Sequence, residues 1–224
     1  MSLKFAFSLI GCLLIANLNS TAADEKNPST RWESTIQKFE QADKKQSPPK
    51  GAILFVGSSS IRLWDLENSF PEHTVINRGF GGSEVADSLF YADRIVTKHQ
   101  PRQVVMYAGD NDIAHNKTPE TVARDFRQFV KKVRQELPNV PIAYIAIKPS
   151  LSRWKLAETM KEANALIEQQ CEANENLEYI DVWNPMIGKD GKPRPELFRD
   201  DGLHLNKKGY TLWNSLVEPV LVDE

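Results

Sequence analysis

The chain has 224 residues, of which 41% are hydrophobic and 26% charged, and its formal net charge is −2 at pH 7. This length suits one domain with a sizeable core, and the composition is ordinary for a globular protein. The slight acidic excess argues against a nucleic-acid partner, which would normally require a basic surplus.

The first 23 residues have the pattern of a secretory signal peptide. Lys4 gives a short basic start, an almost entirely apolar run spans residues 5–16, and polar residues then lead to Ala22 and Ala23. The run is too short to span a membrane, and cleavage is expected after Ala22 or Ala23. Residues 9–12 resemble a lipoprotein cleavage box, but the apolar run continues past Cys12, so we do not expect lipidation. We predict a secreted or periplasmic protein with a single mature domain over residues 24–224.

Because Cys12 lies in the predicted signal, Cys171 is the only cysteine of the predicted mature chain. No intrachain disulfide is therefore expected, although an exported protein could form one. Cys171 lies in a helical pattern and is interpreted as a small buried hydrophobe. No later stretch is long enough to span a membrane.

After a polar tether, predicted helices and strands alternate along the chain. Apolar side chains at helical spacing predict helices over residues 34–43, 84–98, 119–137, 154–174 and 206–217. Short apolar runs predict strands over residues 52–56, 74–76, 103–107, 141–147 and 177–182. Residues 108–116 are predicted as a polar loop and residues 183–200 as an irregular segment. This alternation predicts a three-layer α/β/α fold, with a five-stranded parallel sheet in a flavodoxin-like, doubly wound arrangement.

The serines of Gly57-Ser58-Ser59-Ser60 follow the first predicted strand, at the sheet edge where open α/β proteins bind ligands. A serine at such a strand-to-helix turn can act as a nucleophile, and its own backbone N–H can stabilise negative charge. The alternative is that these serines only cap the next helix. The stretch is not a G-x-S-x-G nucleophile elbow, because Ile61 stands two residues after Ser59.

A glycine-rich turn at residues 77–83 follows the second predicted strand. Gly79, Gly81 and Gly82 allow the backbone to approach a ligand closely and to point N–H groups at it. A phosphate-binding loop is the alternative, although Gly82 comes one residue too early for the G-x-G-x-x-G spacing.

The third predicted strand is followed by Gly109-Asp110-Asn111-Asp112. The side-chain amide of Asn111 is a neutral donor suited to an oxyanion hole. A simple turn is one alternative, because these residue types favour turns. A metal site formed by Asp110, Asp112 and His115 is another, but these residues lack a recognisable ligand spacing.

Asp201 and His204 lie three residues apart just before the last predicted helix. At this spacing the carboxylate can reach the imidazole and fix its tautomer, as a catalytic base requires. The alternative is a surface or capping histidine. His73, His99 and His115 are interpreted as structural or solvated.

Taken in chain order, these four clusters resemble the SGNH, or GDSL-type, hydrolase superfamily, which is named for its serine, glycine, asparagine and histidine. The resemblance runs from about Gly51 to Leu221, and it extends to esterases similar to the α subunits of platelet-activating-factor acetylhydrolase, including secreted bacterial ones. It implies a serine esterase without metal or organic cofactor. The implied catalytic residues are Ser59, Asp201 and His204, and the implied oxyanion donors are Ser59, Gly82 and Asn111.

The sequence departs from the family pattern at one position, because Ser58 stands where the family usually has Asp in Gly-Asp-Ser. Ser58 and Ser60 therefore compete with Ser59 as nucleophile, and Ser59 is preferred because it keeps the family spacing from Gly57. Gly81 is the alternative to Gly82. Residues on the same strand-end loops that could line a pocket are Arg78, Phe80, Lys148, Ser150, Trp183 and Arg199.

The expected substrate is a small-molecule ester with a short acyl group such as acetyl, with an acetylated sugar as one candidate. Lysophospholipids and thioesters remain open, because the superfamily is promiscuous by resemblance. Two other classes of function compete with the esterase: a non-catalytic binding module on the same fold, and a flavodoxin-like phosphate-binding protein. The oligomeric state does not follow from the sequence.

Overall fold

The computed structural model describes residues 27–223, so the predicted signal peptide, its cleavage sites and the lipoprotein-like box lie outside the described residues. Five strands form one sheet in the order β2-β1-β3-β4-β5, and every neighbouring pair is parallel. This is the flavodoxin-like strand order, and the predicted fold class is confirmed. The strands are β1 (Ile53–Gly57), β2 (Val75–Gly79), β3 (Gln103–Tyr107), β4 (Ile142–Ile145) and β5 (Leu177–Ile180).

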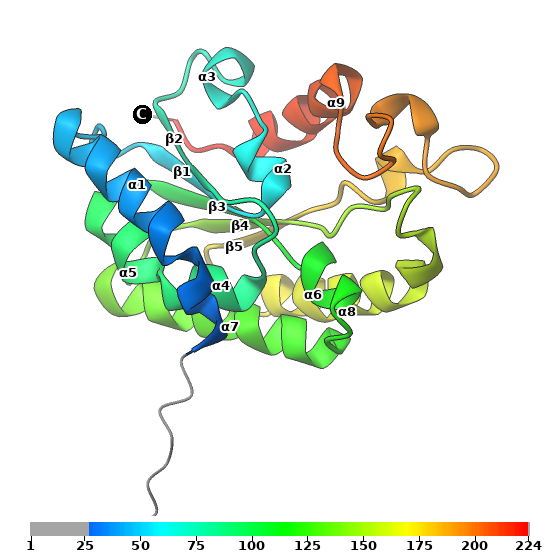
Figure 1. Cartoon of the computed structure of the whole chain (residues 1–224), viewed down its shortest axis with the longest axis horizontal. Coiled ribbons are helices and arrows are strands. Elements are labelled where there is room, and N and C mark those ends of the chain that lie inside the picture. Colours follow the sequence, from blue (N-terminus) through cyan, green and yellow to red (C-terminus); the bar gives the residue numbers. More distant parts are fainter. Residues whose placement is uncertain (1–26, 224) are drawn as a thin grey trace, which may run out of the picture.

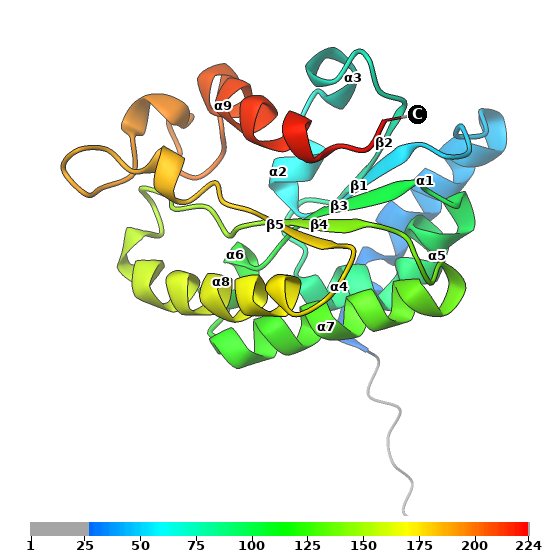
Figure 2. The same cartoon turned by 180° about the vertical axis from the view of Figure 1, so that it is seen from behind.

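Helices cover both faces of the sheet, as Figures 1 and 2 show. One face carries α1 (Glu33–Lys45), α4 (Val85–Phe90), α5 (Ala92–Ile95), α7 (Pro119–Glu136) and α8 (Ala157–Glu172). The other face carries α2 (Ser59–Arg62), α3 (Leu66–Ser69) and α9 (Lys207–Val217). A short helix, α6 (Asp110–Ala114), follows β3.

Successive side chains of β1 enter two different cores. Leu54 and Val56 pack in the cluster that contains Phe126 of α7, whereas Ile53 and Phe55 pack in the cluster that contains Trp213 of α9. All five residues of β1 and of β3 are buried, while the edge strands β2 and β5 are partly exposed. Central strands buried on both faces explain the continuous apolar runs in the sequence.

Two predicted elements differ from the structure in kind and not only in their bounds. The helix predicted over residues 84–98 is interrupted at Tyr91, which ends α4 and precedes α5. The Tyr91 ring is buried, and its hydroxyl donates to the carbonyl of Ser29, so a tertiary contact overrides the helical pattern. The loop predicted over residues 108–116 contains α6, which begins after Gly109 with its φ of 114°.

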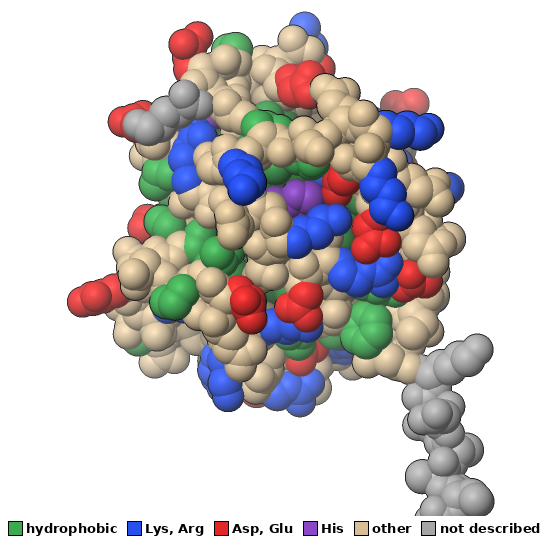
Figure 3. Space-filling model, turned by 90° about the vertical axis from the view of Figure 1, so that its left-hand side faces the viewer, with side chains coloured by type: hydrophobic (Ala, Val, Ile, Leu, Met, Phe, Trp, Pro, Cys, Tyr) green, Lys and Arg blue, Asp and Glu red, His purple; other side chains and the backbone are tan. Residues whose placement is uncertain are grey.

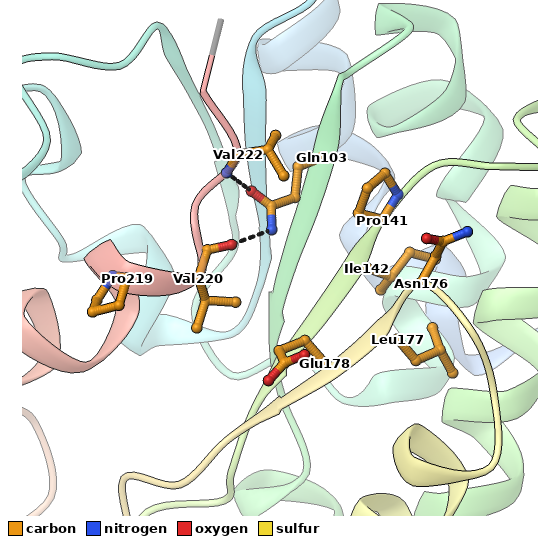
Figure 4. A pocket seen from close by; sticks show the side chains of 9 residues that line it. All are labelled: Gln103, Pro141, Ile142, Asn176, Leu177, Glu178, Pro219, Val220 and Val222. Atoms are coloured by element: carbon orange, nitrogen blue, oxygen red, sulfur yellow. Dashed lines mark hydrogen bonds between the residues drawn. The ribbon is translucent and has the colours of Figure 1, made fainter.

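The C-terminal segment is fastened to the amino-terminal end of β3. The side-chain amide of Gln103 donates to the carbonyl of Val220 and accepts from the N–H of Val222, as Figure 4 shows. A cavity of about 510 Å³ lies beside this contact, between the C-terminal segment and the starts of β4 and β5. Acidic and basic side chains are interspersed on this side of the molecule (Figure 3). Among residues 27–223, no helix has the length and apolar character to cross a membrane.

Candidate active site

The turn after β1 places Ser59 at the carboxyl end of the strands. Gly57 has a φ of 133°, and a Cβ on it would lie 1.9 Å from the carbonyl oxygen of Tyr107 in β3, so this position requires glycine. The N–H of Ser58 donates to the same carbonyl oxygen. Ser59 is the first residue of α2. No helical turn precedes it, so its backbone N–H has no acceptor within the helix.

Ser59, His204 and Asp201 form a continuous hydrogen-bonded chain. The Oγ of Ser59 lies 3.0 Å from Nε2 of His204, and Nδ1 of His204 lies 2.6 Å from Oδ2 of Asp201. The other carboxylate oxygen of Asp201 accepts the N–H groups of Leu203 and His204, both at 2.9 Å. The loop before α9 thus brings the predicted residues together, with the carboxylate on one ring nitrogen and the serine on the other.

These contacts distinguish the three adjacent serines. Ser59 is half-buried and reaches His204, whereas Ser58 and Ser60 are buried. The hydroxyl of Ser58 has no hydrogen-bond partner among the described residues, and the carbonyl of Ser60 accepts from the hydroxyl of Tyr210. Only Ser59 of the three therefore has a base next to its hydroxyl.

The hydrogen bond from the His204 side chain holds the pKa of the Asp201 carboxyl well below its usual range, and the two backbone N–H groups act in the same direction. The ionised carboxylate accepts the Nδ1 proton of His204 and leaves Nε2 free to accept a proton from Ser59. The geometry therefore suits His204 to act as a general base.

The glycine-rich loop is tied to the turn that carries Ser59. The carbonyl of Gly57 accepts from the N–H of Phe80 at 2.8 Å and from the hydroxyl of Ser83 at 3.2 Å. Between these two anchors, Gly82 has a φ of 80°, and its N–H has no hydrogen-bond acceptor in residues 27–223. The loop therefore has an unpaired backbone donor at Gly82, and it is held against the turn that carries Ser59.

Asn111 lies in the first turn of α6 and is buried. Its Nδ2 donates to the carbonyl of Ser83 at 2.9 Å, and its Oδ1 accepts from Nη2 of Arg153 at 3.0 Å. An amide nitrogen carries two hydrogens, so one N–H of Asn111 remains for a ligand. Asn111 and Gly82 are thus joined through Ser83, the residue that follows Gly82.

Two of the residues predicted as pocket-lining have other partners. Arg78 is buried, bonds Asp43 of α1 and lies over the ring of Phe39. Phe80 is completely buried and packs edge-to-face on Trp32. Both side chains therefore pack against α1 or the residue that precedes it.

The other predicted pocket residues lie on the loops beyond β4 and β5 and before α9. Lys148 is buried with its Nζ 3.6 Å from Oδ2 of Asp110; burial lowers the pKa of its ammonium, while Asp110 opposes this shift. The hydroxyl of Ser150 is buried without a partner among the described residues. Trp183 is buried and stacks on Trp154. Arg199 is exposed, and its Nε donates to the carbonyl of Leu205.

The side chains considered for a metal site face different partners. Oδ2 of Asp110 accepts from Arg153, and Asp112 and His115 contact Lys117 and Glu84 respectively. No group of three or more histidine, cysteine, aspartate or glutamate side chains placed to hold a metal ion occurs within residues 27–223.

A doubly wound α/β fold with serine, histidine and aspartate joined at the carboxyl ends of its strands is an arrangement typical of hydrolases. The chain belongs to the GDSL-like lipase/acylhydrolase family, whose sequence profile matches residues 62–212. The protein is accordingly an ester hydrolase. The matched range includes Asn111, Asp201 and His204, and it begins three residues after Ser59.

Several solved structures share the fold. A provisionally named platelet activating factor of Streptococcus pneumoniae is 21% identical with a TM-score of 0.77, over 86% of this chain and 94% of that chain. A GDSL-like lipase of Bacteroides thetaiotaomicron is 18% identical with a TM-score of 0.71, over 84% and 97%. A carbohydrate esterase of family 3 from Talaromyces cellulolyticus is 16% identical with a TM-score of 0.59, over 75% and 94%. A comparison with curated proteins found no match.

Proposed function

We propose that this chain is a serine esterase that hydrolyses carboxylic esters through an acyl-enzyme, with Ser59 as nucleophile. The observation that carries the proposal is the position of His204, whose two ring nitrogens lie 3.0 Å from the Ser59 hydroxyl and 2.6 Å from the Asp201 carboxylate. Nucleophile, base and orienting carboxylate are the parts that acyl transfer by serine needs.

In the proposed reaction, His204 takes the proton of Ser59 as its Oγ attacks the ester carbonyl. Asp201 orients the imidazole and stabilises the imidazolium. The N–H groups of Ser59 and Gly82 and the side-chain amide of Asn111 donate to the oxyanion of the tetrahedral intermediate. His204 then gives its proton to the departing alcohol, and a water molecule, deprotonated by His204, hydrolyses the acyl-enzyme.

The proposed substrates are small esters with a short acyl group such as acetyl, with acetylated sugars as the first candidates. The likeness to a carbohydrate esterase supports this choice. From the predicted signal peptide we also propose that the protein works outside the cytoplasm.

Hydrolysis of p-nitrophenyl acetate by the wild type, Ser59→Ala and Ser58→Ala tests the proposal. Wild type and Ser58→Ala should both be active, and Ser59→Ala should fall to the buffer rate. Equal rates in wild type and Ser59→Ala would show that Ser59 is not the nucleophile. A series of acetate, butyrate and octanoate esters, followed by acetylated sugars, then tests the preference for short acyl groups.

A further inference from the structure

The side-chain amide of Asn111 can serve an oxyanion only in one of its two orientations. Its nitrogen donates hydrogen bonds and its oxygen only accepts them, yet the two ends have nearly the same shape. Packing alone therefore does not decide which end faces the substrate. The polar neighbours of the amide must do so.

Arg153 and Ser83 are these neighbours. The guanidinium of Arg153 can only donate, and its Nη2 lies 3.0 Å from Oδ1 of Asn111. The carbonyl of Ser83 can only accept, and it lies 2.9 Å from Nδ2 of Asn111. Rotating the amide by half a turn would set donor against donor and acceptor against acceptor. Both contacts therefore select the orientation that leaves one N–H of Asn111 for a ligand.

Arg153 is itself held in place. Its Nη1 bonds Oδ2 of Asp110 at 3.0 Å, so the planar guanidinium spans two adjacent residues of α6. Lys148, buried beneath, lies 3.6 Å from the same carboxylate oxygen. The Arg153 side chain is only 20% exposed. A guanidinium has the rigid fork that such a two-acceptor contact needs, whereas an ammonium does not.

The loop that carries Arg153 also contacts the base. The N–H of Ser152 donates to the carbonyl of Gly202, which lies between Asp201 and His204. A Cβ on Gly202 would lie 3.1 Å from Cβ of Leu151, so the two loops are in close contact. Residues 151–153 therefore join the His204 loop to the amide of Asn111.

We propose that Arg153 is a positioning residue for the oxyanion hole: it fixes and polarises the Asn111 amide so that the free N–H faces the substrate oxygen. This role rests on the proposed esterase function. A cation on the carbonyl end of an amide strengthens donation from its nitrogen. The contribution arises in the transition state, where the charge develops, and therefore affects kcat more than KM.

The first test is the steady-state hydrolysis of p-nitrophenyl acetate by Arg153→Met and Arg153→Lys. Arg153→Met keeps most of the aliphatic stem and removes the donors. It should lower kcat roughly 10- to 100-fold, less than the loss of the Asn111 donor itself, and change KM less than about threefold. Arg153→Lys keeps the positive charge but lacks the planar guanidinium, so its kcat should lie between those of the wild type and Arg153→Met. Arg127→Ala, an exposed arginine on α7, is the matched control and should remain at the wild-type rate.

A double-mutant cycle with Asn111→Ala separates positioning from a general structural role. If Arg153 acts through Asn111, adding Arg153→Met to Asn111→Ala should cost less than about threefold further in kcat. A merely structural arginine would lower kcat by the same factor in both backgrounds. Thermal unfolding of each variant, monitored by circular dichroism, shows whether it is folded at the assay temperature. If the rate of Asn111→Ala is already as low as that of Ser59→Ala, the cycle cannot be measured. The role of Arg153 is then judged from the kcat and KM of the folded Arg153 single variants.

The results separate this inference from the proposed function. Unchanged kcat in Arg153→Met, a loss confined to KM, or a full additional loss in the double variant would overturn the role of Arg153 while the esterase stands. Equal rates in wild type and Ser59→Ala would overturn the esterase itself, and this role with it.

Discussion

Nε2 of His204 lies 3.0 Å from Oγ of Ser59, although 145 residues separate them in the sequence. β1 ends at the turn that carries Ser59, and the loop before α9 returns His204 to the same edge of the sheet. Because each loop is anchored to a buried strand or helix, the contact depends on the fold and not on local sequence. The effect of this contact on turnover can be measured separately from the effect of the surrounding packing on the free energy of unfolding.

Removing the proposed base, His204, should abolish most turnover while the fold is kept. His204→Ala should lower kcat by about 10⁴-fold or more, as expected when a serine loses its general base. Asp201→Asn should lower kcat less, because half of the Asp201 side chain faces solvent, which can partly replace it. Steady-state kinetics with p-nitrophenyl acetate measure both. If His204→Ala kept more than a tenth of the wild-type kcat, His204 would not be the base.

The acid side of the pH profile should contain a single ionisation. The hydrogen bond from His204 holds the pKa of Asp201 below its usual range, so Asp201 stays ionised while an imidazole gains its proton. Protonated His204 cannot accept the proton of Ser59. We therefore expect log(kcat/KM) to fall with a slope no greater than one over the range around pH 4, where an unpaired carboxyl would gain its proton. A slope approaching two over that range would mean that Asp201 titrates there as well.

Gly57→Ala should destabilise the protein far more than a glycine substitution in open space. The new Cβ would lie 1.9 Å from the Tyr107 carbonyl oxygen, and φ is 133°. We expect a loss of roughly 3 kcal/mol or more in the free energy of unfolding, from strain and the forced separation of β1 and β3. Gly51→Ala is the matched control, because φ is 68° there but nothing lies within 4 Å of its Cβ. Gly51→Ala should lower the free energy of unfolding by about 1 kcal/mol. Urea unfolding that gave equal losses for the two variants would contradict this account of the turn.

His99 should make the fold sensitive to acid. Burial, aided by the charge of Arg78, lowers the pKa of its imidazole to about 4, against the opposing effect of Asp43. The unfolded chain then binds a proton that the folded chain does not, so stability falls as the pH drops from 6.5 towards 4. At pH 5 the loss is roughly 2 kcal/mol relative to pH 7. His99→Gln should shrink the difference in unfolding free energy between these two pH values by that amount. An unchanged difference would show that His99 is not responsible.

Most of the fold is predictable from the sequence, because buried strands and amphipathic helices leave local patterns. β3 has the predicted bounds, whereas β2 extends past its predicted end to Gly79. The polar residues that hid this extension, Asn77 and Arg78, find partners in the carbonyl of Ile61 and in Asp43. These are tertiary contacts, and a propensity argument does not contain them.

In the candidate site, too, residues that follow a local sequence pattern could be predicted, whereas a residue placed by a tertiary contact could not. Asp201 and His204 are recognisable from their spacing, and Ser59 from its place after a buried strand. Arg153 was not predicted, because it meets Asn111 across 42 residues and only after the loop beyond β4 folds back. The one available signal was its position on a strand-end loop, which it shares with Lys148 and Ser150. That signal gives a location but no role.

Covalent labelling is the decisive test of the proposed role of Ser59 as nucleophile. The wild-type protein is treated with a fluorophosphonate and digested with trypsin, and residues 51–62, which hold all three serines, are sequenced by tandem mass spectrometry. We predict one adduct, on Ser59, that is absent from Ser59→Ala and forms more slowly in His204→Ala. An adduct on Ser58 or Ser60, or equal labelling of Ser59→Ala and wild type, would contradict it.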